Sequence, residues 1–150
     1  MIECGANPYE IAQHVYGTYS LGRIKLLNMA LDSLEISDNG MVSIMTLTHR
    51  MLAETRTQPE DIDGIINYAR GIEDVRLAAL IHEVSNGQTE SCQKKKKYNV
   101  SLRSDGSVDV SRISARYGGG GHARAAGFSI ESNLDNLRAE LMNLSEMIPQ

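Results

Sequence analysis

Gly118-Gly119-Gly120-Gly121-His122-Ala123-Arg124-Ala125-Ala126-Gly127 is the stretch around which this chain is organised. Four successive glycines can adopt positive φ and leave their N–H groups uncovered, so they can form a concave set of donors, here called the glycine nest. The alanines that follow favour a short helix whose positive dipole end points the same way. His122 and Arg124 add side-chain donors at its edge. The pattern predicts a phosphate-binding site.

A flexible linker is the alternative interpretation of the glycine run. Linkers, however, are usually mixtures of glycine and serine, and they seldom lead directly into an alanine-rich turn that carries one histidine and one arginine. A binding site is therefore the favoured interpretation.

The segment before the glycine run reads as a strand followed by a turn. Tyr98–Ser104 alternates in polarity, which turns Arg103 away from the apolar face. We expect Arg103 to face the glycine nest across a polar edge of the sheet. Asp105-Gly106 is a turn signal, 107–110 can continue as a short strand, and Ser111 can cap the helical turn that leads into the glycines.

The other elements follow from periodicity, capping residues and turn signals. The expected helices cover 9–16, 20–34, 48–54, 60–68 and 133–147, and the second of them has an apolar stripe at Leu21, Ile24, Leu27, Leu31 and Leu34. The expected strands cover 34–37, 41–47, 75–84 and 128–130. The first two of these strands form a hairpin around Asp38-Asn39-Gly40. This order predicts an α/β fold with a mixed sheet of about four or five strands flanked by helices. We assign residues 1–34 to a helical connector and residues 35–150 to a substrate-binding domain.

Composition narrows the possible functions. The net charge of −4 argues against a protein that coats nucleic acid through a broad basic face. The two cysteines, Cys4 and Cys92, are too far apart in sequence to suggest a disulfide framework or a zinc cluster. No segment has the length and apolarity of a membrane span, so we expect a cytoplasmic protein with no membrane partner. The lysine run 94–97 is either a nucleic-acid clamp or, as we favour, a solvated loop.

Catalytic groups are sparse. His14, His49, His82 and His122 have no ligand-type spacing, no Gly-x-Ser-x-Gly elbow occurs, and neither cysteine has a recognisable nucleophile context. The acidic pairs Asp61/Asp63 and Glu73/Asp74 fit helix-end or surface roles better than paired acid–base roles. The residues therefore indicate a binding site without its own catalytic centre.

The chain resembles the DHH-associated C-terminal domain of DHH-family phosphoesterases. The resemblance rests on the glycine-rich segment 118–128 and on two segments upstream of it, Val100–Ser104 and 108–113. Residues 65–72, followed by 75–83, are also similar to the family. The two leading helices resemble the family's interdomain connector. The most similar branch is the oligoribonuclease (nanoRNase) and adenosine bisphosphate phosphatase type.

By this resemblance the domain holds short oligoribonucleotides or nucleotide bisphosphates, while an N-terminal domain with an Asp-His-His motif and two manganese ions hydrolyses the phosphodiester, as in an exonuclease. Carried over to this sequence, the substrate-binding residues are Arg103, Ser104, Gly118, Gly119, Gly120, Gly121, His122 and Arg124. No Asp-His-His motif occurs in the chain. We therefore expect a fragment that has neither metal nor catalytic residues and is inactive alone.

Two alternatives remain. One is the related RNA-binding C-terminal domain of alanyl-tRNA synthetase, although the chain contains no long preceding coiled coil or synthetase sequence. The other is an interaction domain in which the glycine run is only a tight corner.

Overall fold

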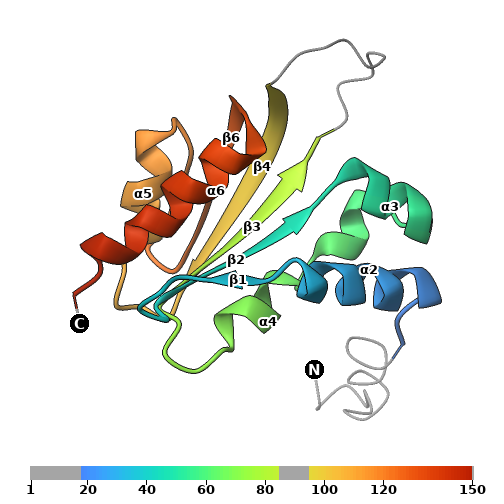
Figure 1. Ribbon diagram of the computed structural model, residues 1–150, viewed down its shortest axis with the longest axis horizontal. Coiled ribbons are helices and arrows are strands. Elements are labelled where there is room, and N and C mark those ends of the chain that lie inside the picture. The colour runs from blue at the N-terminus through green and yellow to red at the C-terminus, as the bar shows by residue number, and fades with distance from the viewer. Residues whose placement is uncertain (1–17, 85–94, 150) are drawn as a thin grey trace, which may run out of the picture.

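The computed structural model describes residues 18–84 and 95–149 (Figure 1). Its elements, in chain order, are α2 (Leu21–Asp32), β1 (Glu35–Ile36), β2 (Val42–Leu47), α3 (His49–Thr55), the 3-10 helix η2 (Pro59–Ile62), α4 (Ile66–Arg70), β3 (Leu77–Glu83), β4 (Lys96–Ser104), α5 (Val110–Arg116), β5 (Gly120–His122), β6 (Ala125–Ser132), α6 (Leu134–Asn143) and the 3-10 helix η3 (Leu144–Met147). The helix expected over 9–16 lies outside the described residues.

The strands form one six-stranded sheet in the order β1-β2-β3-β4-β6-β5. β2 and β3 are parallel, and the other neighbouring pairs are antiparallel. Parallel neighbours need a crossover connection, and here α3, η2 and α4 provide it. The expected α/β fold with a mixed sheet is confirmed. The sheet has six strands instead of the expected four or five, because β5 was not predicted.

Helices cover the two faces of the sheet unevenly (Figure 1). On one face, which we call the α5/α6 face, residues of α5 and α6 form a cluster with Ile81, Val100, Leu102 and Phe128 of the strands. On the other face, α2, α3 and α4 cover β2 and β3, α4 also lies against β4, and the buried cluster there contains no residue of β4, β5 or β6. We call the surface of β4, β6 and β5 on this side, beyond α4, the open face.

Two local expectations are confirmed near the N-terminal half of the sheet. The hairpin forms around Gly40, which has a φ of 75°, and joins β1 to β2. Thr48 caps α3, accepting a hydrogen bond from the N–H of Met51. Both signals depend on residues close in sequence, which is why they are reliable.

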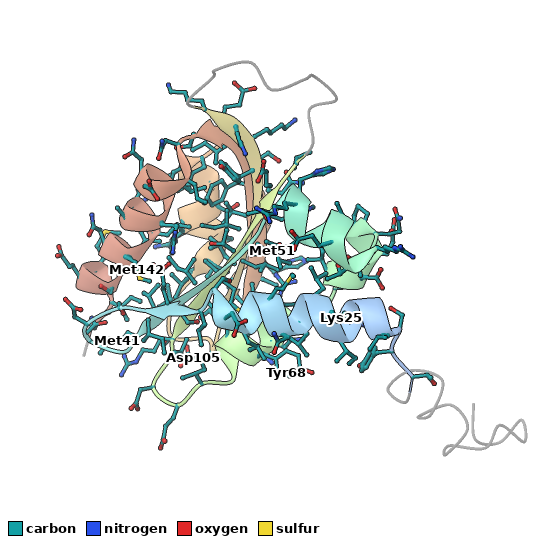
Figure 2. All side chains as sticks on the ribbon, turned by 45° about the vertical axis from the view of Figure 1, so that its right-hand side comes forward. Lys25, Met41, Met51, Tyr68, Asp105 and Met142 are labelled. Atoms are coloured by element: carbon teal, nitrogen blue, oxygen red, sulfur yellow. The ribbon has the colours of Figure 1, made fainter. Side chains whose placement is uncertain are left out.

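Helix α2 starts where expected, after the cap Ser20, but it buries a different face. Of the expected apolar stripe, Leu27 and Leu34 pack against the buried cluster of that face, whereas Leu21, Ile24 and Leu31 are 69%, 47% and 42% exposed. The buried residues are Leu26 and Ala30. The reason is the close approach of α2 to α3, which leaves only 2.5 Å between a Cβ built on the glycine at position 22 and the carbonyl oxygen of the last α3 residue. Lys25 of α2 and Tyr68 of α4 lie exposed on this side of the molecule (Figure 2).

Three other expectations are wrong in detail. The helix over 60–68 is divided into η2 and α4 by Gly64, which has a φ of 84°. No strand forms over 107–110, because the Ser104 hydroxyl accepts hydrogen bonds from the N–H groups of Gly106 and Val108 and holds the loop bent. Asp109, rather than Ser111, caps α5.

The strand expected over 75–84 is confirmed as β3, whose first five residues are buried. The lysine run is less loop-like than expected, because Lys96 and Lys97 already belong to β4 and Lys96 pairs with Glu83 at 2.7 Å. The C-terminal helix is confirmed as α6 and η3, with Leu137 and Leu141 fully buried. Burial of each such side chain contributes about 1.5–3 kcal/mol.

Among the described residues, no helix combines the length and the apolar character needed to traverse a bilayer.

Candidate phosphate-binding site

The first two glycines of the run end helix α5. Gly118 has a φ of 73°, and its N–H donates to the carbonyl of Ala115 at 3.1 Å, while the N–H of Gly119 donates to the carbonyl of Ser114 at 3.0 Å. This pair of bonds is a Schellman motif, in which a left-handed residue after the helix lets the chain turn back on its last carbonyls. Two of the four N–H groups expected to face an anion are therefore used within the fold, and the continuous glycine nest does not form.

The second half of the run is a strand rather than the start of a helix. β5 pairs with β6 through Gly120↔Gly127 and His122↔Ala125, and Ala123-Arg124 forms the turn between the two strands. The carbonyls of the two turn residues accept hydrogen bonds from the N–H groups of residues 110 and 104. The expected short helix is thus wrong, because tertiary pairing overrides the weak helix propensity of alanine.

The four glycines have different reasons to lack a side chain. A Cβ at Gly119 would lie 2.3 Å from the carbonyl oxygen of Gly127, and one at Gly121, whose φ is 141°, would lie 2.5 Å from that of Ala125. A Cβ at Gly120 would meet no atom within 4 Å, and its φ is not in the positive region. Gly118 needs positive φ, Gly119 needs space, Gly121 needs both, and Gly120 needs neither.

Ser114 fastens the glycine run to the sheet. Its side chain is fully buried, and its hydroxyl donates to the carbonyl of Gly127 at 2.6 Å. The ring of Tyr117 stacks on Phe128 of β6, with ring centroids 4.2 Å apart, and its hydroxyl donates to Glu140 of α6 at 2.7 Å. These contacts hold the end of α5 against β6, so the position of β5 is well determined. The sequence interpretation did not assign a role to either residue.

Register places Arg103 and His122 on the open face. Leu102 is fully buried in the α5/α6 face, and adjacent residues of a strand point to opposite faces, so Arg103 points to the open face. Arg103 is opposite Ala125, and Ala125 is opposite His122. With strands about 4.8 Å apart, the backbones of Arg103 and His122 are about 10 Å apart, with a small alanine between them.

The side chains of Arg103 and His122 both retain donors for a ligand. Arg103 is half-buried, and its Nη1 donates to the carbonyl of its neighbour Leu102 at 3.0 Å. This bond leaves most of the five guanidinium N–H donors unused. His122 is exposed and makes no hydrogen bond or ion pair with the described residues. An anion resting over Ala125 can therefore be approached from both sides.

Ser104 and Arg124, also predicted site residues, have other surroundings. Ser104 is 1% exposed. Its hydroxyl accepts hydrogen bonds from the N–H groups of Gly106 and Val108 and therefore organises the 104–108 loop. The Arg124 guanidinium lies over Gly106, where a Cβ would be 2.9 Å from its Nε. Arg124 is exposed at the tip of the β5–β6 hairpin, beside the Arg103–His122 pair but not on the row that joins them.

Two further polar residues of the open face were not predicted as site residues. The Ser129 hydroxyl donates to Oδ1 of Asn99 at 2.6 Å, and both residues are exposed. They are direct partners in the β4–β6 register. The alternation of β4 indicated that Asn99 points outward, but only the pairing of β4 with β6 brings it to Ser129.

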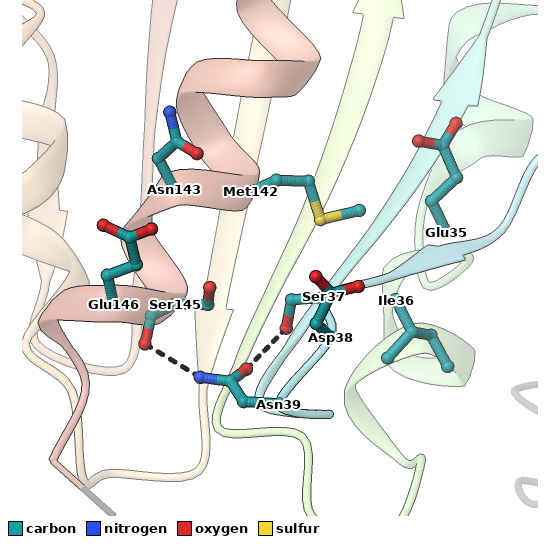
Figure 3. Close-up of a pocket in the computed structure, with 9 residues that line it drawn as sticks. All are labelled: Glu35, Ile36, Ser37, Asp38, Asn39, Met142, Asn143, Ser145 and Glu146. Carbon is teal, nitrogen blue, oxygen red and sulfur yellow. Dashed lines mark hydrogen bonds between the residues drawn. The ribbon is translucent and has the colours of Figure 1, made fainter.

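A pocket of about 500 Å³ lies at the opposite edge of the sheet, between the β1–β2 turn and the end of α6 (Figure 3). Asn39 crosses from the turn to η3 and donates to the carbonyl of Ser145 at 3.0 Å. The lining includes the carboxylates of Asp38 and Glu146, together with that of Glu35, which pairs with Arg138. Negative charges repel phosphate, so this pocket does not fit the predicted ligand.

The histidines in the described residues do not form a metal centre. His82 lies at the end of β3, half-buried, and burial lowers its pKa, with the nearby Glu83 opposing and His49 reinforcing the shift. Residues 18–84 and 95–149 contain no group of three or more His, Cys, Asp or Glu side chains placed to hold a metal ion.

Comparison with known proteins gives the fold a family. The chain is similar in structure to an exopolyphosphatase-related protein from Bacteroides fragilis, with a TM-score of 0.80 and 21% identity over 95% of this chain and 40% of that one. It is also similar to the pGpG-specific phosphodiesterase PggH from Vibrio cholerae, with a TM-score of 0.53 and 11% identity over 85% of this chain and 40% of that one. The chain thus spans 40% of the length of either structure. Residues 39–146 match the family described as the DHHA1 domain, and the chain belongs to that family.

Proposed function

We propose that this chain is the substrate-binding module of a DHH phosphoesterase and that it holds a terminal phosphate of a short oligoribonucleotide or a nucleotide bisphosphate. The observation that carries the proposal is the row Arg103–Ala125–His122 on the open face. An arginine and a histidine that share one side of a sheet, with only a methyl group between them, leave room for one anion. The family match and the phosphoesterase relatives support the same class of ligand.

The chemistry of the two side chains favours phosphate. Guanidinium presents parallel N–H donors that match two oxygens of a phosphate group, and such charge-assisted bonds are stronger than neutral ones. The imidazole adds a ring N–H donor. The row is local, so an overall charge of −4 is compatible with a small anionic ligand that is bound at one point.

Hydrolysis belongs, in this proposal, to a separate DHH domain. In-line attack on phosphorus needs an activated water, which a pair of metal ions supplies by lowering the pKa of the bound water. We propose that manganese ions serve this purpose in a domain that carries the Asp-His-His motif, which this sequence does not contain. The solved relatives, of which this chain spans 40%, have the additional length for such a domain. The oligoribonuclease and bisphosphate phosphatase branch remains our proposed assignment.

A labelled dinucleotide tests the proposal directly. We expect the chain to bind it weakly, because the contacts are exposed to water and salt, and to leave it intact when manganese is added. Binding is followed by amide chemical shifts of residues 118–122 and by the side-chain resonances of Arg103. Binding that leaves all of these resonances unchanged, or no binding at all, would contradict the proposed site. Metal-dependent cleavage above the level of contaminants would contradict the division of labour.

A further inference from the structure

The open face carries a second cationic position in line with Arg103. Lys97 lies six residues before Arg103 on β4, and residues an even number of positions apart in a strand share a face. At about 3.3 Å per residue, the two Cα atoms are about 20 Å apart. The adjacent Lys96 points to the opposite, α5/α6 face, where its Nζ donates to Glu83 at 2.7 Å. The last two lysines of the run are therefore divided between the two faces of the sheet.

The surface between Lys97 and Arg103 is low and uncharged. Two rows of β4, β6 and β5 separate the two cations, and they consist of Ser101, Gly127 and Gly120 in one row and of Asn99 and Ser129 in the other. A Cβ built on Gly120 would meet nothing within 4 Å, and glycine in a strand allows a ligand to approach the backbone closely. We call these two rows the floor of the open face. A chain-like ligand can follow β4 across this floor from one cation to the other.

Lys97 has one acidic neighbour on the same face. Its direct partner in the β4–β6 register is Glu131, and both residues are exposed. The ion pairs formed within residues 18–84 and 95–149 do not include one between them. The ammonium group of Lys97 is therefore available to an anionic ligand, while the carboxylate of Glu131 weakens the positive potential around it.

We propose that Lys97 binds a second phosphate of an oligoribonucleotide whose terminal phosphate is held at Arg103 and His122. The open face then binds a single strand along β4, with its charged backbone contacted at both ends of the floor. Positively charged grooves that follow the backbone are a general means of binding single strands without regard to base sequence. The contact at Lys97 is of this kind, because a lysine offers a point charge to a phosphate and does not read a base.

The distance between the two cations determines the length of ligand that can use both. Side chains of a strand stand roughly perpendicular to the sheet, so the charged groups of Lys97 and Arg103 are about as far apart as their Cα atoms. A stacked strand advances about 3.4 Å per nucleotide, so about 20 Å corresponds to about six nucleotides, and an extended strand covers it with fewer. A dinucleotide or a nucleotide bisphosphate is too short. This inference rests on the proposed function, which supplies the first phosphate position, and it selects oligoribonucleotides among the proposed ligands.

Oligouridylates of two, four and six nucleotides, phosphorylated at both ends so that either strand direction is covered, test the inference by calorimetry with the whole chain. At about 0.1 M salt, exposed charges more than about 10 Å apart are largely screened. The hexanucleotide should bind about two- to fivefold more tightly than the dinucleotide, the effect of one exposed ion pair. Lys97→Gln should remove this gain and leave dinucleotide affinity unchanged. It should also reduce the magnitude of the hexanucleotide's salt slope by about 0.7, the value of one phosphate contact to a single strand.

Two further variants make the test specific. Glu131→Gln should strengthen binding of the hexanucleotide but not of the dinucleotide, since it removes the negative charge beside Lys97. Lys96→Gln is the matched control, because it removes the same charge one residue away on the other face, and it should retain the length dependence. Retention of the wild-type melting temperature in both lysine variants excludes misfolding as the cause of a change.

The outcomes separate this inference from the proposed function. Equal affinities of the wild type for the dinucleotide and the hexanucleotide, or equal effects of Lys96→Gln and Lys97→Gln, overturn the inference. Binding that still depends on Arg103 in that case leaves the proposed function intact. Absence of binding at every length overturns both.

Discussion

Arg103 of β4 and His122 of β5 lie on the same face of the sheet, on either side of Ala125 of β6. The two residues are only 19 positions apart in sequence, yet they belong to strands that are not neighbours. Their relationship depends on the register of two strand pairs at once. A shift of one residue in either pair would send one of the two side chains to the opposite face.

Replacing Arg103 by lysine tests whether the guanidinium binds phosphate as a fork. Lysine keeps the positive charge but offers a point charge in place of two parallel donors. We expect Arg103→Lys to weaken nucleotide binding measurably and Arg103→Ala to weaken it further, since charge-assisted bonds contribute about 1.5–3 kcal/mol each. Calorimetry at one fixed salt concentration gives the affinities. Arg112→Lys, at an exposed position of α5, is the control and should bind nucleotide as the wild type does. Unchanged affinity in both Arg103 variants would remove Arg103 from the site.

His122 should contribute to nucleotide affinity through its ring N–H. A neutral imidazole carries one N–H donor in either tautomer, and a hydrogen bond to a charged group contributes about 1.5–3 kcal/mol. We therefore expect His122→Ala to weaken nucleotide binding about tenfold or more, and His122→Gln, which keeps an N–H donor, to weaken it less. His49→Gln, at an exposed position of α3, is the control. Unchanged affinity in His122→Ala would remove His122 from the site.

The neighbouring glycines Gly119 and Gly120 should respond differently to alanine. A Cβ at Gly119 would be 2.3 Å from the backbone oxygen of Gly127, whereas one at Gly120 would meet nothing within 4 Å. Gly119→Ala should lower the free energy of unfolding by about 1–3 kcal/mol, the usual cost of overpacking. Gly120→Ala should change it by less than about 0.5 kcal/mol. Urea unfolding measures both values.

Nucleotide binding separates structure from function at these two positions. Because the added methyl group of Gly120→Ala would stand on the floor of the open face, we expect weaker nucleotide binding in a protein of normal stability. Equal stability of the two variants would contradict the inward packing of Gly119. Undiminished binding by Gly120→Ala would mean that the ligand does not lie on this part of the sheet.

Tyr117 should make the fold sensitive to high pH. Burial, followed by the hydrogen bond and the negative charge of Glu140, raises the pKa of Tyr117 from 10.0 to about 12. An unfolded tyrosine ionises at the lower value, so the stabilisation is complete below pH 10 and is lost as pH rises toward 12. Tyr117→Phe keeps the ring stacked on Phe128 but removes the ionisable group. The decline in unfolding free energy above about pH 10 should therefore be smaller in this variant.

Tyr68→Phe is the control for this measurement, because Tyr68 is 52% exposed and should leave the high-pH decline unchanged. Absorbance of ionised tyrosine at high pH provides a second readout, since the wild type should contain one more late-titrating tyrosine than Tyr117→Phe. Tyr98, whose pKa burial also raises, is present in both proteins. An identical pH dependence in wild type and Tyr117→Phe would show that the hydroxyl of Tyr117 does not contribute.

Local signals in the sequence predicted much of the fold. Ser20 and Thr48 cap helices as expected, and the Asn-Gly turn at Gly40 joins two strands. The alternation of β4 correctly turned Arg103 away from the core. Each of these features involves residues within a few positions of one another, so the energies that decide them are present in the sequence itself.

The boundaries of the connector remain a prediction, since the family match begins at residue 39 and does not test a division at residue 34. α2, which we assigned to the connector, buries Leu26 and Ala30 in the same cluster as strand residues of β2. Its buried face could not be read from its apolar spacing, because α2 carries leucines on more than one side and only its contact with α3 selects among them.

The amino-acid sequence by itself determined the α/β class, the caps of α2 and α3, the hairpin and the residue types of the proposed phosphate site. Tertiary structure alone decided how the glycine run is used: two glycines close α5, two enter a strand, and alanines with high helix propensity become β structure. It also brought His122 and Asn99 onto the face that Arg103 shares. The physical reason is that strand pairing and close packing join residues distant along the chain, and their free energies exceed the local preferences that a sequence pattern records.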